Sequence, residues 1–150
     1  MKGVDIMYIT KIKYKNFNDE DREMEACFHM SEAEIIDYGV EVPGGLGGVI
    51  KKITEEHDTK SLAKVMKDLI VRSYGIKSDD GNRFIKNQQI LDEFMQTPAY
   101  SEFYMTLATN DKIAADFFNG IIPKKLRDRV EKDGMVGTAT IATMPATPNA

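Results

Sequence analysis

The sequence predicts an α+β fold in which an N-terminal antiparallel β-hairpin is followed by five or six short helices that pack as a small, predominantly helical domain. Two stretches near the N-terminus alternate apolar and polar residues, and later segments repeat apolar residues at helical spacing. The composition, 42% hydrophobic and 29% charged, is ordinary for a globular protein. We expect a single domain at residues 1–134, with the hairpin at about 7–30, the helices at about 32–132, and a disordered tail rich in small residues at 135–150.

The hairpin is predicted from two alternating stretches, Tyr8 to Lys15 and Glu23 to Met30, separated by turn-forming residues. Antiparallel pairing would place the lysines of the first strand opposite the glutamates of the second on the solvent side, where each pair contributes up to about 1 kcal/mol. An isolated hairpin is marginally stable in water. We therefore expect its apolar face to lie on the helix at the centre of the chain.

That central helix is predicted between Asp58 and Gly75, where Gly75 would take the left-handed conformation that ends many helices. Its apolar stripe has the spacing of one helix face. The stripe consists of Leu62, Val65, Met66, Leu69 and Ile70.

Capping signals predict the other helices. Ser31 and Glu34 form a capping box, and Thr97 followed by Pro98 begins a later helix. The glycine-rich stretch 44–48 precedes another helical pattern and is predicted to be a frayed first turn or a mobile loop, because glycine disfavours helix. Further helices are expected within 88–96, from Asn110 to about Gly120, and, as a short charged helix at best, within 124–132.

The sequence lacks a recognisable catalytic or cofactor-binding motif. Cys27 is the single cysteine, which excludes an internal disulfide and suits a reducing compartment. Cys27 and His29 are the one close pair of soft ligands, whereas a zinc site needs three or four. The glycine-rich stretch 44–48 lacks the lysine and hydroxyl residue of a phosphate-binding loop, and 79–82 lacks the glutamate of a calcium loop. We expect no enzyme activity, no metal and no cofactor.

The net charge of −4 argues against nucleic acid as the main ligand. No apolar run is long enough to span a membrane, and residues 1–6 do not form a secretory signal; either Met1 or Met7 could be the true start. A small nucleic-acid-binding regulator stays open as an alternative. Such a regulator would bind through the basic patch Lys124, Lys125, Arg127 and Arg129. Acidic residues interspersed in this patch favour a solvated helix face instead.

Aromatic residues are concentrated in the second half of the chain. Most are expected in the core, but short helices cannot bury all of them, and exposed aromatic and methionine side chains mark binding grooves. We therefore expect a partner with an apolar helix to dock on a surface there. The candidate binding residues are Phe94, Tyr100, Phe103, Tyr104, Phe117 and Phe118.

An ordered set of motifs resembles the tail assembly chaperones of long-tailed (siphovirus- or myovirus-type) bacteriophages. The hairpin and the capping box are followed by four segments in the same order as in that family, and together they cover about residues 7–123. The segments are Leu69 to Gly75, Ser78 to Lys86, Phe94 to Glu102, and Phe117 to Pro123.

The resemblance implies a chaperone that binds the long tape measure protein in the host cytoplasm, keeps it soluble, recruits tail tube subunits and is absent from the mature virion. It implies no catalytic residues, and it suggests a second, longer product made by ribosomal frameshifting. Self-association of the chain stays open as an additional interaction. A structural tail or connector subunit that stays in the virion is the alternative function.

Overall fold

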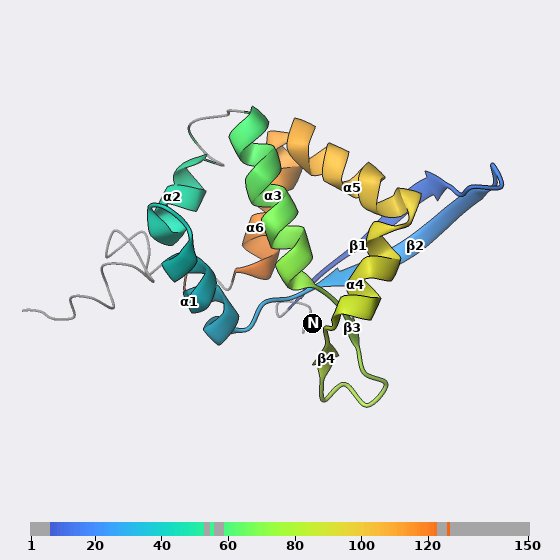
Figure 1. Cartoon of the computed structure of the whole chain (residues 1–150), viewed down its shortest axis with the longest axis horizontal. Coiled ribbons are helices and arrows are strands. Elements are labelled where there is room, and N and C mark those ends of the chain that lie inside the picture. Colours follow the sequence, from blue (N-terminus) through green and yellow to red (C-terminus); the bar gives the residue numbers. More distant parts are fainter. Residues whose placement is uncertain (1–6, 53–54, 56–58, 123–125, 127–150) are drawn as a thin grey trace, which may run out of the picture.

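The computed structural model describes residues 7–52, 55, 59–122 and 126 of the chain (Figure 1). It confirms the predicted α+β class, with an N-terminal hairpin followed by helices. Two short strands between the third and fourth helices were not predicted. The elements in chain order are β1 Tyr8–Lys15, β2 Asp21–Phe28, α1 Glu32–Glu41, α2 Gly45–Lys51, α3 Thr59–Ser73, β3 Tyr74–Lys77, β4 Phe84–Ile85, α4 Gln88–Met95, α5 Pro98–Thr109 and α6 Asp111–Ile121.

The strands form one antiparallel sheet in the order β1-β2-β3-β4. The predicted hairpin register is confirmed, because Lys11, Lys13 and Lys15 pair with Glu25, Glu23 and Asp21 across β1 and β2. At the distal end, Lys15 Nζ lies 2.9 Å from Asp21 Oδ1. β3 and β4 contain only four and two residues, too few for a period-2 pattern to be read from sequence.

The prediction that Gly75 ends the central helix was wrong. α3 ends at Ser73, and Gly75 lies in β3, where it pairs with Cys27. A Cβ atom on Gly75 would lie 2.5 Å from Phe84 Cε2 and 2.7 Å from the carbonyl oxygen of Ile85. Glycine is therefore required here because the ring of Phe84 and the backbone of β4 lie directly against the strand.

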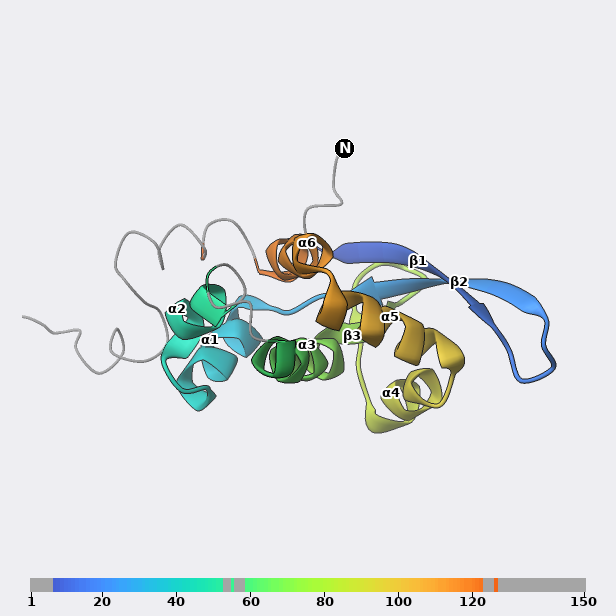
Figure 2. The ribbon, with the colours of Figure 1, turned by 90° about the horizontal axis from the view of Figure 1, so that it is seen from above.

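The hairpin does not pack chiefly on the central helix, as the sequence suggested, but on α5 and α6. α5 contacts α3, α4, α6 and β1, and it therefore lies at the middle of the helical layer (Figure 2). The distal part of the hairpin extends beyond these helices (Figures 1 and 2). This projection leaves part of its inner face uncovered by described helices.

Helix starts follow the predicted capping signals. Both bonds of the Ser31–Glu34 capping box are present, and Thr97 caps α5 ahead of Pro98. The glycine-rich stretch is not a loop: Gly44, with φ +81°, caps a short helix that begins at Gly45. The helix buries Leu46 and Val49, and this burial offsets the poor helix propensity of its glycines.

The core centres on Phe28, whose ring contacts five other rings. Centroid distances range from 5.1 Å, to a stacked Phe103, to 6.3 Å. Such pairs contribute about 0.5–1.5 kcal/mol each beyond the burial of their surface. The five partners are Tyr8 of β1, Tyr74 of β3, Phe94 of α4, Phe103 of α5 and Phe117 of α6.

Several predictions from the sequence concern residues outside the ranges that the structure describes. The domain boundary at residue 134, the tail at 135–150 and the choice between Met1 and Met7 as the start lie wholly or partly outside the described residues, as does almost all of the charged helix at 124–132. The basic patch at 124–129 also lies outside them, and these remain predictions.

Gly120 provides a test of how closely α6 approaches β1. It lies in the last turn of α6, and a Cβ there would lie 2.5 Å from Tyr8 Cδ1 and 3.1 Å from Tyr8 Cβ. We expect Gly120→Ala to lower the free energy of unfolding by about 1–3 kcal/mol, as overpacking does. In an open helical site the same change would raise it, by up to about 1 kcal/mol. Urea denaturation measures the sign.

The control is the same substitution in a Tyr8→Ala background, where the ring that it meets is absent. The cost of Gly120→Ala should then largely disappear, giving a coupling energy in a double-mutant cycle. An equal cost in both backgrounds would contradict the close contact between α6 and β1.

Candidate functional site

The structure places the six candidate aromatic residues in two environments. The four phenylalanines, Phe94, Phe103, Phe117 and Phe118, are at most 5% exposed and belong to the core. Only Tyr100 and Tyr104 are partly exposed. The surplus of exposed ring surface expected from the sequence is therefore limited to two tyrosines, because the hairpin supplies Phe28 and Tyr8 as additional packing partners for the phenylalanines.

Tyr100 and Tyr104 form a stacked pair on the flank of α5 that faces α4. Their ring centroids are 5.9 Å apart, and the planes differ by 4°. Tyr100 also meets Phe94 of α4 edge-on at 5.7 Å, and burial raises the pKa of its hydroxyl. Met105 follows on the outer side of α5 and is 53% exposed. We call these three residues the tyrosine flank.

On its opposite side, α5 borders a furrow that runs along β1. It consists of two adjoining hollows of about 340 Å³ and about 670 Å³ that share Lys13 and Glu102. We call this the β1–α5 furrow. Its lining is Tyr8, Thr10, Lys11, Ile12, Lys13, Glu102, Phe103, Thr106, Ile113 and Asp116 in the first hollow, and Lys13, Tyr14, Lys15, Asp21, Arg22, Glu23 and Glu102 in the second.

The furrow arises because the hairpin is longer than the helices that cover it. Its chemical character is mixed rather than purely apolar, since rings and aliphatic side chains alternate with charges of both signs. At its inner end, burial raises the pKa of the Tyr8 hydroxyl, and the negative charge of Asp116 raises it further. The Tyr8 hydroxyl therefore stays protonated at neutral pH, and it shares a hydrogen bond with the side chain of Thr10. The alternation in the sequence indicated which face of β1 points inward, but the furrow itself depends on where α5 lies along that strand.

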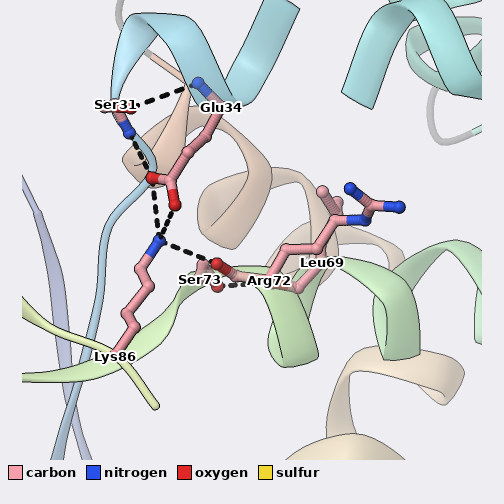
Figure 3. Close-up of polar contacts among 6 residues, drawn as sticks. All are labelled: Ser31, Glu34, Leu69, Arg72, Ser73 and Lys86. Atoms are coloured by element: carbon pink, nitrogen blue, oxygen red, sulfur yellow. Dashed lines mark hydrogen bonds and ion pairs between the residues drawn. The ribbon is translucent and has the colours of Figure 1, made fainter. Parts of the chain in front are cut away.

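A polar junction lies on another side of the molecule, at Lys86 just after β4 (Figure 3). Lys86 Nζ donates to both carboxylate oxygens of Glu34 at 2.9 Å and to the carbonyl oxygen of Arg72 at 2.8 Å. Glu34 Oε1 also accepts from the backbone amide of Ser31 at 2.8 Å. The junction therefore connects the start of α1 with the end of α3, where an ammonium group satisfies a terminal carbonyl.

The charges at the junction are balanced. Burial would raise the pKa of Glu34, but the hydrogen bonds from Lys86 and Ser31 outweigh it and lower that pKa below its usual value of 4.5. Glu34 is thus ionised at neutral pH, and its contribution to stability is present above about pH 4.5 and lost as the pH falls through the lowered value. These partners are those of a structural ion pair rather than of an acid or base poised near neutral pH.

Cys27 and His29 do not form a reactive pair. Burial raises the pKa of the Cys27 thiol, and the neighbouring Glu25 raises it further, which keeps the thiol protonated. His29 instead meets the ring of Phe84 edge-on at 5.4 Å. Within the described ranges, no three His, Cys, Asp or Glu side chains are grouped closely enough to hold a metal ion, and no helix has the length and apolar character to cross a membrane.

The described residues thus present two candidate contact surfaces, the tyrosine flank and the β1–α5 furrow. The sequence profile of the phage tail assembly chaperone family matches residues 7–149. No curated protein and no solved structure matches the chain significantly. Since the profile covers nearly the whole sequence, the chain belongs to the phage tail assembly chaperone family, which is not a class of enzymes.

The junction can be tested by Lys86→Met, which keeps an unbranched side chain one heavy atom shorter and removes its charge. We expect a loss of about 1–2 kcal/mol in the free energy of unfolding, because Glu34 and a helix-terminal carbonyl lose their partner while Glu34 stays partly solvated. Thermal and urea denaturation measure the change. Lys112→Met is the control, because Lys112 is 84% exposed in a 3.4 Å pair with Asp116, and it should cost little. An equal loss of unfolding free energy in Lys86→Met and Lys112→Met would contradict a structural role for the junction.

Glu34→Gln tests the same junction through its pH dependence. At neutral pH the variant should be less stable than wild type, because it lacks the charge that Lys86 pairs with. The difference should narrow as the pH falls below about 4.5, since the wild-type carboxylate then becomes protonated. Urea denaturation across this pH range measures it; a gap that stays constant with pH would contradict an ionised Glu34.

Proposed function

We propose that this chaperone binds the tape measure protein of its phage in the host cytoplasm, keeps it soluble and recruits tail tube subunits around it, without remaining in the mature virion. The observation that carries the proposal is the family match across residues 7–149. The tape measure protein is the partner that the family resemblance implies, a long and largely helical chain. Such a partner needs its apolar stripes covered before the tube forms.

The β1–α5 furrow has dimensions that suit a helical segment. β1 has eight residues, which at ~3.3 Å per residue extend over about 26 Å. A helix of that length has about 17 residues at ~1.5 Å each. The furrow can therefore accept nearly five helical turns, enough for a sequence-encoded stripe to be recognised.

The lining of the furrow matches an amphipathic helix. Tyr8, Tyr14 and Ile113 line the furrow and are partly exposed, so they offer apolar and aromatic surface on which the apolar stripe of the partner would lie. Lysines on β1 and Glu102 on α5 stand nearby as charged groups of opposite sign. A helix with charged residues beside its apolar stripe would find complementary charge there, which favours the correct orientation.

The tyrosine flank supplies a second contact in this proposal. Tyr100, Tyr104 and Met105 lie away from the furrow, so a neighbouring segment of the partner or a tail tube subunit can occupy them while the furrow is filled. Tyrosine and methionine are enriched at protein interfaces. Buried phenylalanines act indirectly, because Phe94 and Phe117 pack against Tyr100 and Phe103 of α5 and so hold that helix in the position that both surfaces need.

The proposal requires many weak contacts rather than one strong contact. Several copies on one long partner would add their affinities through multivalency. The net charge of −4 on each copy would keep the coated partner from associating with other coated partners. Both properties fit a chaperone that must later be displaced by the tail tube.

The test is co-expression of the chain with the tape measure protein of the same phage. We expect the tape measure protein to become soluble and to co-purify with the wild-type chain. Thr106→Arg, which places a long charged side chain in the furrow, should reduce co-purification by about tenfold or more. A tape measure protein that stays insoluble with the wild-type chain would contradict the proposed function.

Thr109→Arg is the matched control for the furrow. Thr106 and Thr109 are on the same helix, and each donates its hydroxyl to the carbonyl four residues earlier, of Glu102 and Met105 respectively. Only Thr106 lines the furrow. Equal recovery of the tape measure protein with Thr106→Arg and Thr109→Arg would remove the furrow from the proposal. Undiminished recovery of that protein with Tyr104→Asp would remove the tyrosine flank.

A further inference from the structure

The outer face of the sheet, at the base of the hairpin, carries a ring that does not belong to the Phe28 cluster. Successive strand residues point to opposite faces, so Cys27 and His29 point away from the face on which Phe28 packs. Cys27 pairs with Gly75 of β3. Gly75 has no side chain, and the ring of Phe84 lies directly against it on this outer face.

A small pocket of about 120 Å³ lies beside the Phe84 ring. Met7, His29 and Phe84 line it, and the rings of His29 and Phe84 meet edge-on at 5.4 Å. Lys77 pairs with Phe84 across β3 and β4, so the two side chains share a face of the sheet. The remaining lining residues are Gly81, Asn82 and Arg83. The pocket therefore joins an apolar and aromatic wall to a basic rim.

The basic rim consists of Lys77 and Arg83. Both are exposed, and neither forms an ion pair with any of the described residues. The loop between β3 and β4 contains two carboxylates, but neither lines the pocket. That of Asp80 accepts from the Ser78 hydroxyl at 2.7 Å and from the Asn82 amide at 2.9 Å. The rim is thus positive in a chain whose net charge is −4.

The loop that carries Arg83 is closed by its own hydrogen bonds. The amide of Ser78 donates to the Arg83 carbonyl at 2.9 Å, and the Arg83 amide donates to the Ser78 hydroxyl oxygen at 3.0 Å. Gly81, with φ +77°, donates its amide to the Ser78 carbonyl at 2.9 Å. Because these bonds need no ligand, the backbone around the pocket is pre-organised, which lowers the entropy lost on binding.

We propose that this pocket binds the C-terminal end of a second protein, with the last side chain inside and the terminal carboxylate against Lys77 and Arg83. The pocket is slightly smaller than a cavity of ~150 Å³ that holds one benzene ring, so it suits a branched aliphatic side chain such as that of leucine. The basic rim calls for a negative group close to that side chain. A chain end carries both groups on one Cα atom, and capture of a terminal carboxylate is a recurring mode of peptide recognition.

The pocket is separate from the surfaces of the proposed function. It shares no lining residue with the β1–α5 furrow, and it contains no residue of the tyrosine flank. A chain end and a second segment can therefore bind at the same time. The inference does not rest on the proposed function, because the contact requires only this chain and a terminal carboxylate.

The test uses N-acetyl-leucine, a minimal chain end, titrated into the isotope-labelled full chain and followed by two-dimensional NMR. We expect the backbone amide signals of His29, Lys77 and residues 81–84 to shift. N-acetyl-leucinamide has the same side chain without the charge, and it should bind about fivefold more weakly, as expected for loss of exposed ion pairs. Added salt should weaken the binding of N-acetyl-leucine but not that of the amide.

Variants of the rim test the two cations. Arg83→Gln and Lys77→Gln should each weaken the binding of N-acetyl-leucine by about two- to fivefold. Lys11→Gln is the matched control, because Lys11 is an exposed lysine that pairs with Glu25 on β2 and does not line the pocket. This control should bind as wild type does, and the amide spectra also show whether each variant is folded.

Three results would overturn the proposal: no shift at these amides, equal affinity for the acid and the amide, or an equal loss in Arg83→Gln and Lys11→Gln. Acetyl-aspartyl-leucinamide carries its carboxylate on the preceding residue. Tighter binding of this probe than of N-acetyl-leucine would assign the pocket to an internal acidic segment and would also overturn the proposal. Co-purification of the tape measure protein is a separate measurement, so either idea can fail without the other.

Discussion

The ring of Phe28 is the contact on which the rest of the molecule depends. It stacks on Phe103 and meets rings from β1, β3, α4 and α6, so that the hairpin and the helices are held through one side chain. Phe28 is fully buried at the last position of β2, where the strand leaves the hairpin and enters the domain. A short hairpin has little stability of its own, and this cluster gives its inner face a rigid support.

The cluster also explains why α5, rather than the longer α3, organises the helical layer. Phe103 brings α5 onto Phe28, and α5 then contacts α3, α4, α6 and β1. Because α5 is shorter than the hairpin that it covers, the distal strands project and the β1–α5 furrow opens beside them. The surfaces available to partners thus arise because α5 and the hairpin, which pack together around Phe28, differ in length.

Membership of the phage tail assembly chaperone family gives these surfaces a biological setting. The proposed function requires reversible binding, and a mixed furrow and half-exposed tyrosines suit that better than a deep apolar cleft.

The sequence by itself determined the local structure: the alternation of the two strands, the lysine–glutamate register, the capping box at Ser31 and the cap at Thr97 followed by Pro98. These features depend on residues close together in the chain, whose geometry is set by backbone hydrogen bonding and period. Tertiary structure alone decided that Gly75 and Gly120 are sites of close approach, that four of the six candidate rings are buried, and that Tyr100 and Tyr104 stay at the surface. Burial depends on which distant segment lies opposite, and no local pattern distinguishes a ring that meets Phe28 from one that meets water.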